Sequence, residues 1–387
     1  MLASVFGPRL RVQPVADIRE AYLEATAKSM GYVNFGPLDF LQPLELILND
    51  LMHQSHLSPL GHIAAPFFIK KNLKMRLALN RAKESRAPTS LQRPIFILGL
   101  PRTGSSILQE LLVQHPDLGA PTFWASHHWP RDSAWDLVTQ NLTRAQIAVL
   151  DILAPTFRRV HALNTMSPHE CVSIQGFAFR SMHFHVAFRL PSYNQAMMAE
   201  DFDWTPAYKL HADYLGLLPH APNRWLLKAP GHMLGLDALI EQYPDALFVQ
   251  THRDPQEVIP SMASLTLSLR GLASNYIDKA EIGRDVDDLW HMGITKTMST
   301  RAADDQLNRR FFDIRYQDLL ADPVTTLGKV LKFADLAEPD NFDQLVKAHL
   351  QRRPKHQHGK HHYSAEQFHF QSGKLKEKYQ RYTETYL

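Results

Sequence analysis

The chain has 387 residues, of which 44% are hydrophobic and 21% are charged, a balance that fits one large domain with an extension or two domains. Its formal net charge of +3 excludes the clustered basic excess of a nucleic-acid-binding protein, but it allows a local site for an anionic small molecule. No stretch approaches the roughly 18 consecutive apolar residues of a membrane-spanning helix.

The only cysteine is Cys171, so an intramolecular disulfide is excluded and a reducing compartment is indicated. Its neighbours in SPHEC could activate a thiolate, but a buried, inert thiol is the expected state. The apolar part of the N-terminus is too short for a signal peptide. We therefore expect a cytoplasmic protein.

Residues 15–85 are predicted to be helical. FLQPLELILNDLMHQ carries apolar residues at helical spacing, and KKNLKMRLALNRAKES reads as an amphipathic basic helix. A segment rich in Pro and Ser follows at 86–94. The sequence therefore predicts a helical N-terminal extension over 1–90 and a second domain over 91–387.

Short apolar strands and helices alternate in the second domain. The strands are expected at 95–99, 224–228, 246–253 and 311–316, and a helix is expected from Ser105 to about residue 114. This alternation predicts an α/β fold of three layers, in which helices cover both faces of a parallel sheet. Ligands of such sheets bind beyond the carboxyl ends of the strands, so the residues at those ends should converge.

The loop after the first strand, in LGLPRTGSSIL, resembles a phosphate-binding P-loop. Gly99 and Gly104 occupy the two glycine positions of G-x-x-x-x-G-K-[ST], but Ser105 stands at the lysine position and the nearest cation is Arg102. Backbone N–H groups and hydroxyls at the start of the following helix would hold the phosphate. These donors belong to Arg102, Thr103, Gly104, Ser105 and Ser106.

Arg253 and Ser261 form a second candidate site. Arg253 leaves the end of a strand, and Ser261 follows about two helical turns later. An arginine and a hydroxyl at this separation can clamp another phosphate. Asp254 and Glu257, in contrast, fit a helix N-cap and a capping box and are interpreted as structural.

Lys228 and His232, in WLLKAPGH, form a third candidate site. Lys228 ends an apolar strand, and His232 begins the next helix. A cation and an imidazole at this edge could stabilise the charge of a leaving group and accept a proton. A histidine at the start of a helix more often packs or caps, so both interpretations stay open.

Four segments together resemble the sulfotransferases that use 3′-phosphoadenosine-5′-phosphosulfate (PAPS), in their bacterial branch. They are PIFILGLPRTGSS at 94–106, WLLKAPGH at 225–232, THRDPQEVIPS at 251–261 and YQDLLADP at 316–323. The resemblance covers about residues 95 to 370. It implies metal-independent transfer of a sulfuryl group from PAPS to a hydroxyl of a small acceptor, with adenosine 3′,5′-bisphosphate as product.

The resemblance also implies roles for these residues. The loop over 102–106 would hold the 5′-phosphate, with Arg102 where the family usually has a lysine that contacts the sulfuryl group. Arg253 and Ser261 would hold the 3′-phosphate. Lys228 and His232 match the lysine at the strand end and the general base.

The sequence departs from its relatives at Ala125, where many of them carry an acidic residue. The general base is therefore left open among four side chains. They are His232, Glu170, His127 and His128.

The histidine-rich tail, KHQHGKHHYSAEQF, resembles a segment that closes the site in relatives. Lys360 and His361 are candidates for reaching the 3′-phosphate. The tail lacks the cysteines and the spacing of a metal site, so we expect no metal there.

Two alternatives remain at this point: a P-loop small-molecule kinase and a non-catalytic nucleotide-binding protein. The missing P-loop lysine disfavours the kinase. The aromatic segment at 176–193 favours a lipophilic hydroxyl as acceptor, although a carbohydrate or a phenol also fits.

Overall fold

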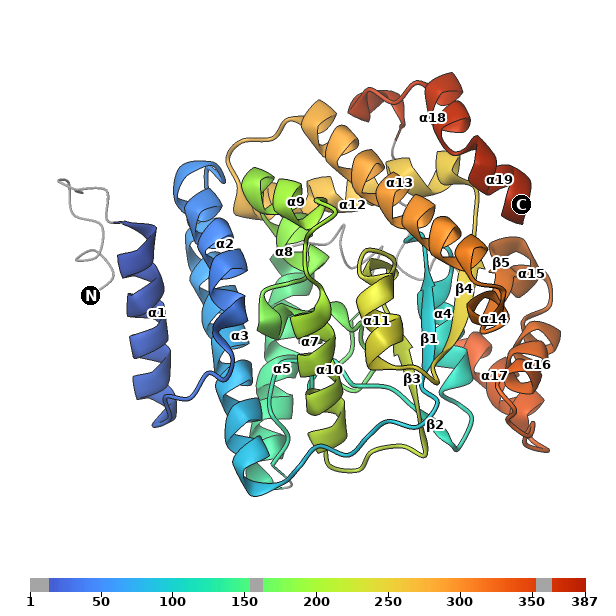
Figure 1. Cartoon of the computed structure of the whole chain (residues 1–387), viewed down its shortest axis with the longest axis horizontal. Coiled ribbons are helices and arrows are strands. Elements are labelled where there is room, and N and C mark those ends of the chain that lie inside the picture. The colour runs from blue at the N-terminus through green and yellow to red at the C-terminus, as the bar shows by residue number, and fades with distance from the viewer. Residues whose placement is uncertain (1–13, 132, 154–162, 353–363) are drawn as a thin grey trace.

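The computed structural model describes residues 14–131, 133–153, 163–352 and 364–387. Its centre is a five-stranded sheet in the order β2-β3-β1-β4-β5, and all four strand pairings are parallel (Figure 1). The strands are β1 Ile95–Gly99, β2 Leu118–Gly119, β3 Arg224–Lys228, β4 Leu247–His252 and β5 Phe311–Arg315. Their carboxyl ends therefore share one edge, as the alternation predicted.

Side chains of β1 alternate between two hydrophobic clusters, one on each face of the sheet. Phe96 and Leu98 belong to the larger cluster, with helices α10 to α13. Ile95 and Ile97 belong to the smaller one, with α4, α16 and α17. The expected α/β fold, with helices on both faces of a parallel sheet, is thus confirmed.

The helices in the described part of the chain have the following bounds. They are α1 Val15–Met30, α2 Leu41–His53, α3 Pro59–Ser85, α4 Ser105–Leu112, α5 Ala134–Leu153, α7 Val172–Gln175, α8 Met182–Ala187, α9 Pro191–Met197, α10 Thr205–Leu217, α11 Leu236–Gln242, α12 Pro255–Ala273, α13 Lys279–Ala303, α14 Asp305–Asn308, α15 Tyr316–Ala321, α16 Pro323–Phe333, α17 Phe342–Arg352, α18 Ser372–Lys378 and α19 Gln380–Tyr386. Short 3₁₀ helices are η1 Leu38–Phe40, η2 Gly176–Ala178, η3 Pro230–Met233 and η4 Glu366–Phe368. None of the helices described is both long and apolar enough to cross a bilayer.

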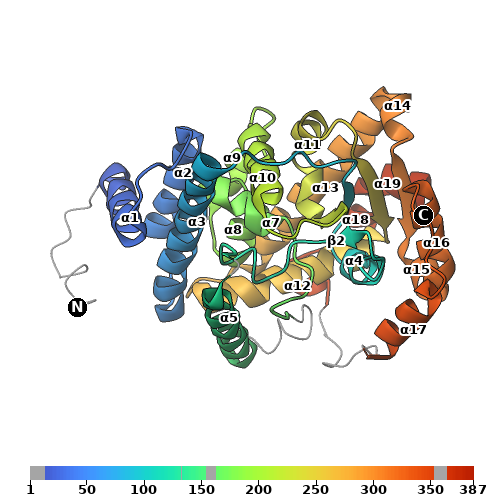
Figure 2. The same ribbon diagram turned by 90° about the horizontal axis from the view of Figure 1, so that it is seen from below.

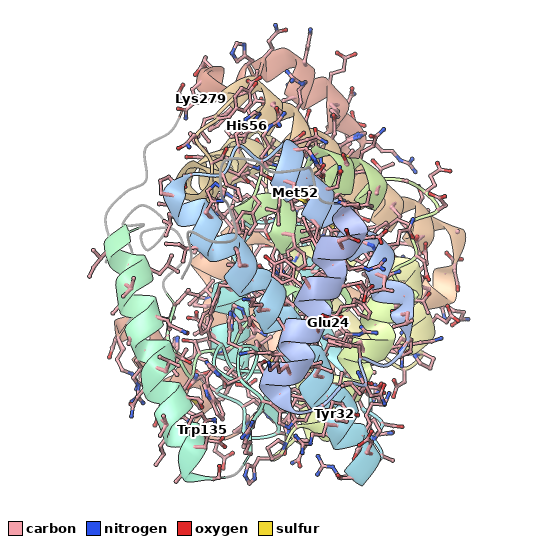
Figure 3. The ribbon with its side chains drawn as sticks, turned by 90° about the vertical axis from the view of Figure 1, so that its left-hand side faces the viewer. Glu24, Tyr32, Met52, His56, Trp135 and Lys279 are labelled. Carbon is pink, nitrogen blue, oxygen red and sulfur yellow. The ribbon has the colours of Figure 1, made fainter. Side chains whose placement is uncertain are left out.

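Helices α1, α2 and α3 precede the sheet and lie at one end of the molecule, with α15 to α17 at the other (Figure 2). Figure 3 views the N-terminal end, where Glu24 of α1 and Met52 of α2 lie at the surface. Leu73 and Leu77 of α3 belong to the same hydrophobic cluster as Phe96 of β1. Helix α3 therefore packs into the core of the α/β part, although the division at residue 90 stays a prediction.

Candidate active site

The turn between β1 and α4 adopts a backbone that favours glycine. Gly99 has φ 128° and Gly104 has φ 84°. A Cβ at Gly99 would lie 2.3 Å from the carbonyl oxygen of Thr251, and one at Gly104 would lie 2.8 Å from the ring of Tyr316. Arg102 also has a positive φ, 64°, a conformation that costs energy for a residue with a side chain. The turn delivers the N-terminus of α4 to the carboxyl edge of the sheet, where its N–H groups can hold a phosphate.

The hydroxyls of this loop have different partners. The Thr103 hydroxyl is buried, donates to the carbonyl oxygen of Leu100 at 2.7 Å and lies 2.6 Å from the Thr251 hydroxyl. Thr103 therefore braces the loop against β4 through its side chain. Ser106, by contrast, faces the end of β3, where its Oγ accepts a hydrogen bond from Lys228.

Lys228 connects the phosphate loop to a carboxylate. Its Nζ donates to Ser106 Oγ at 2.9 Å and to Glu170 Oε1 at 2.6 Å. The lysine side chain is 3% exposed and that of Glu170 is 23% exposed. A buried ammonium thus faces the loop, and a carboxylate beside it remains open to a bound molecule.

Backbone hydrogen bonds on both sides hold Glu170 in place. The His169 N–H donates to the carbonyl oxygen of Pro121 at 2.8 Å, and the Cys171 N–H donates to that of Lys228 at 2.9 Å. The backbone of the carboxylate residue is therefore fastened to the end of β3. From the sequence, Glu170 is one of several candidate bases, because the segment that contains it is remote from Lys228 in the chain.

Arg253 reaches the phosphate loop from the end of β4. Its Nη1 donates to the carbonyl oxygen of Arg102 at 3.0 Å, and its guanidinium lies 4.4 Å from the ring centroid of Tyr316. The Nε donates to Glu257 at 2.9 Å. Glu257, interpreted as structural, therefore also holds Arg253, whereas Asp254 caps α12 as expected by accepting from the Gln256 N–H. Ser261 is buried on α12, two turns from Arg253.

His232 lies in η3 and is completely buried. Its Nδ1 is 3.0 Å from the Tyr208 hydroxyl, and its ring meets that of Phe96 edge to face, 5.1 Å between centroids. Burial, together with the neighbouring charges of His211 and Lys228, lowers the pKa of His232 far below its usual value. Phe96 belongs to the cluster on the face of the sheet opposite α4, so the His232 ring packs on that face. Its Nε2 is buried and has no hydrogen-bond partner among the described residues.

His127 and His128 lie in the segment that follows β2. The His127 ring stacks on Phe123 at 4.2 Å and lies 5.7 Å from the ring of His169. Burial lowers the pKa of His127 strongly and that of His128 as well. Lys360 and His361 lie outside the described residues.

A polar network that sequence analysis missed fastens the C-terminal helix α19 beside Arg253. His252 lies 2.7 Å from Asp313 and stacks on Tyr386 at 4.3 Å, while Arg301 donates two hydrogen bonds of 2.7 Å to Asp313. Burial by itself would raise the pKa of Asp313, but hydrogen bonds from Arg301 and His252 lower it to about 2. Nothing in the sequence joins these residues, since they come from four different elements, β4, α13, β5 and α19.

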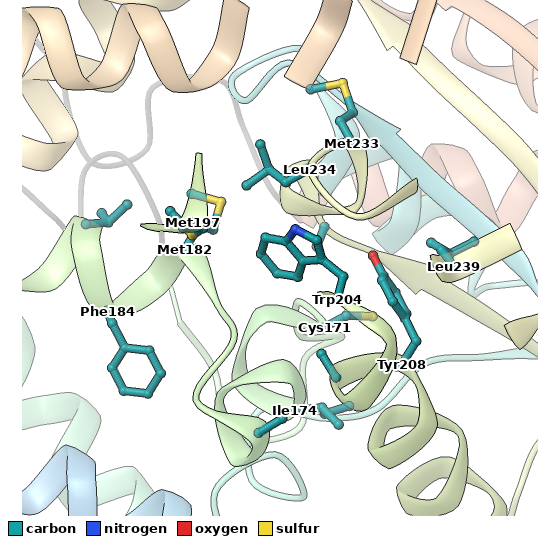
Figure 4. Packing of buried hydrophobic residues seen from close by; sticks show 14 of the residues in the cluster. Cys171, Ile174, Met182, Phe184, Met197, Trp204, Tyr208, Met233, Leu234 and Leu239 are labelled. Carbon is teal, nitrogen blue, oxygen red and sulfur yellow. The ribbon is translucent and has the colours of Figure 1, made fainter. Parts of the chain in front are cut away.

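Cys171 lies in the apolar cluster that also contains Trp204 and Tyr208 (Figure 4). Burial raises the pKa of its thiol to about 12. The predicted burial of this thiol is confirmed. In the described part of the chain, no group of three His, Cys, Asp or Glu side chains is arranged to hold a metal ion.

A family model described as "Sulfotransferase family" matches residues 94–340, more than half of the chain. The chain belongs to the sulfotransferase family. The matched region runs from the start of β1 to beyond α16 and includes Lys228, Glu170 and Arg253. Family membership confirms the resemblance and removes the kinase alternative.

Several similar proteins come from mycobacteria. The chain is 26% identical over 280 residues to the omega-hydroxy-beta-dihydromenaquinone-9 sulfotransferase Stf3 of Mycobacterium bovis and Mycobacterium tuberculosis, and it spans 63% of the length of these relatives and 63% of its own. The crystal structure of sulfotransferase STF1 from M. tuberculosis H37Rv superposes with a TM-score of 0.77 at 27% identity, covering 93% of this chain and 97% of that one. STF9 from Mycobacterium avium superposes with a TM-score of 0.79 at 21% identity, covering 95% and 96%, and shares the fold.

Proposed function

We propose that this protein transfers a sulfuryl group from PAPS to a hydroxyl of a small acceptor by in-line displacement. The acceptor oxygen forms a bond to sulfur, and the bond between sulfur and the bridging phosphate oxygen breaks. The acceptor proton passes to a base, and adenosine 3′,5′-bisphosphate leaves. The contact of Lys228 with both Ser106 and Glu170 is the observation that carries this proposal.

The residues present fit the two phosphates of the donor. The turn over 102–106 ends in the N-terminus of α4, which suits the 5′-phosphate. Arg253 and the buried Ser261 suit the 3′-phosphate. Cationic side chains at the 5′-phosphate and 3′-phosphate sites can neutralise the donor without a divalent metal, because a sulfuryl group carries less charge than a phosphoryl group.

Lys228 and Arg102 would act on the bridging oxygen, where negative charge grows as the bond breaks. Glu170 would accept the proton of the acceptor, since its carboxylate lies beside Lys228 and keeps accessible surface. His232 is the weaker candidate for the base, because its ring is enclosed by apolar and aromatic side chains. Its position supports a packing role.

A lipophilic alcohol or phenol is the acceptor class we propose. The relatives at 26% identity are named for a hydroxylated menaquinone, and the segment at 176–193 is rich in aromatic side chains that are buried in the same part of the chain. A carbohydrate acceptor fits these surroundings less well, because buried apolar walls leave sugar hydroxyls unpaired.

Two measurements test the proposal. Adenosine 3′,5′-bisphosphate should raise the melting temperature without added metal, because it binds the folded state, and ATP with magnesium should raise it much less. Labelled sulfate should pass from PAPS to at least one member of a panel of alcohols, phenols and sugars. A stronger effect of ATP, or bisphosphate binding with no transfer to any class of acceptor, would contradict a PAPS-dependent transferase.

A further inference from the structure

Helix α5 lies at the periphery of the molecule (Figures 2 and 3) and turns a largely polar side inward. Asp136, Thr139 and Thr143 are buried, together with Ile147. The Thr139 hydroxyl accepts a hydrogen bond of 3.0 Å from Nε1 of Trp124. The described side chains of α5 belong to neither hydrophobic cluster of the protein. An ordinary surface helix buries its apolar side, so this arrangement is the reverse of the usual one.

An apolar stripe runs along the outward side of α5. Its members follow one another at alternating spacings of three and four residues, and they are Trp135, Val138, Leu142, Ala145, Val149 and Ile152. All six are exposed, and each of the five large side chains is exposed by 50% or more. This spacing is that of the a and d positions of a coiled coil, which face a partner helix along a narrow seam. The stripe therefore fits another α-helix.

The residues beside the stripe are uncharged. Asn141 and Ala148 flank it on one side, and Thr139 and Gln146 flank it on the other. Charges at such flanking positions would select a different partner helix or repel a second copy of the same one. Helix α5 also has one arginine and no lysine, whereas helices that lie on a membrane surface are rich in basic residues. A second α5 is thus the partner that matches the stripe.

Hydrogen bonds fasten α5 to a fixed base. The N–H groups of Phe123 and Trp124, before the helix, donate to the carbonyl oxygens of Ser167 and Thr165, after it, at 3.0 and 2.9 Å. Trp124 also donates to Thr139 of α5 through its indole. The base and the helix are therefore joined, and the outward side of α5 can meet a partner without rearrangement.

We propose that the stripe on α5 is an interface between two copies of this chain, in which α5 pairs with α5 in antiparallel orientation about a two-fold axis. Leu142 then faces Ala145 of the second copy, so a large side chain meets a small one at the centre. A parallel pair would instead place the two Trp135 rings against each other. The same surface is used on both copies, as in most homodimers. The inference does not depend on the proposed function.

The size of the contact sets the expected strength of the dimer. A helix of 20 residues is about 30 Å long, so one helix pair lies at the low end of specific interfaces. We therefore expect a dimer that dissociates at micromolar concentrations.

Sedimentation equilibrium of the full chain, between about 1 and 200 μM, tests the proposal. Wild type should pass from monomer to dimer over this range. Leu142→Lys should raise the Kd by about 100-fold or more, because it brings two like charges together in an apolar contact. The matched control is Leu137→Lys. Leu137 is 65% exposed on the same helix but lies outside the stripe, so the Kd should stay within about threefold of wild type. Melting temperatures at the lowest concentration should agree among the three proteins, because both substituted side chains are exposed.

Disulfide cross-linking tests the orientation. In an antiparallel pair Val138 faces Val149 of the second copy, so an oxidised mixture of Val138→Cys and Val149→Cys should yield a dimer that joins one variant to the other. Each variant alone should stay largely unlinked, because identical positions then lie about 16 Å apart along the helix axes. The native thiol, Cys171, is completely buried and should take no part.

Each outcome supports the proposal or overturns it. A monomer over the whole concentration range, or a dimer that Leu142→Lys leaves intact, overturns it. Cross-linking of each cysteine variant to itself but not to the other overturns the antiparallel pairing. Binding of a monomeric wild-type protein to phosphatidylcholine vesicles, if Leu142→Lys abolishes it, would assign the stripe to a membrane surface instead. These measurements need no nucleotide, so a failure of sulfuryl transfer leaves their results unchanged.

Discussion

Two polar groups of residues lie at the end of β3, and they differ in what surrounds them. Lys228 faces α4 and contacts the hydroxyl of Ser106 and the carboxylate of Glu170, which keeps accessible surface. His232, four residues later, is enclosed on the other face with Tyr208, and no part of it is exposed. Both groups contain side chains that can move protons. Only the first includes a side chain with appreciable accessible surface, that of Glu170. We therefore propose the first as the catalytic group and the second as structural.

The largest effect is expected from Glu170→Gln, which removes the proposed base without changing its size. Turnover should fall by about 10²- to 10⁴-fold, while the affinity for adenosine 3′,5′-bisphosphate changes little. Single-turnover sulfation and bisphosphate titration on one sample measure both. Turnover above a tenth of the wild-type value would show that the base is elsewhere.

Lys228→Met should follow with a loss of about 10²- to 10³-fold in the rate of the chemical step, the size seen when one donor to a developing negative charge is removed. The effect on PAPS affinity should be smaller than on the rate, since the charge grows only in the transition state. The double variant with Glu170→Gln should lose less than the product of the two single effects, because the two side chains are in contact. If the double variant loses the full product of the two single effects, the two side chains act independently.

Arg253→Ala should weaken PAPS binding by about 10- to 100-fold, the value of a hydrogen bond to a charged group. Binding of adenosine 5′-phosphosulfate, which lacks the 3′-phosphate, should be unaffected. Glu257→Gln is the matched variant. The Glu257 carboxylate accepts a hydrogen bond from the Arg253 guanidinium in this structure. Removing that negative charge should free the guanidinium for the 3′-phosphate and raise PAPS affinity a few-fold. Equal losses for both nucleotides in Arg253→Ala would place Arg253 outside the 3′-phosphate site.

Much of the fold could be predicted from the sequence, because its signals are local. The expected strand ends at Gly99 and Lys228 agree with β1 and β3. The two-residue β2 was missed, since Leu118 and Gly119 are too few to form a pattern. The long helical region proved to be three helices, separated near Gly31 and before Pro59.

The candidate site could be predicted only where its residues follow strand ends. The turn at Gly99, Lys228 and Arg253 all do, and the parallel sheet brings them to one edge. Glu170 comes from a loop outside the sheet. Its proximity to Lys228 depends on tertiary packing, which no spacing in the chain records.

The smallest effect on catalysis is expected from His232→Phe, which changes the buried group that contains His232 and Tyr208. Turnover should stay within about threefold of wild type, because the imidazole is completely buried and a phenyl ring preserves the packing on Phe96. At pH 7 the variant should lose about 1 kcal/mol of unfolding free energy for the hydrogen bond to Tyr208.

Acid should reverse that difference in stability. The pKa of His232 is lowered strongly in the folded state, whereas an unfolded histidine has a pKa of about 6.5. Below that pH the unfolded wild-type chain binds a proton that the folded protein excludes, so its unfolding free energy falls, by about 2 kcal/mol at pH 5 from this one group. The phenylalanine variant is free of this loss and should equal or exceed wild type in urea denaturation at pH 5. A fall in turnover of 10²-fold or more in folded His232→Phe, with bisphosphate affinity unchanged, would instead make the buried imidazole the base and assign Glu170 to the positioning of Lys228.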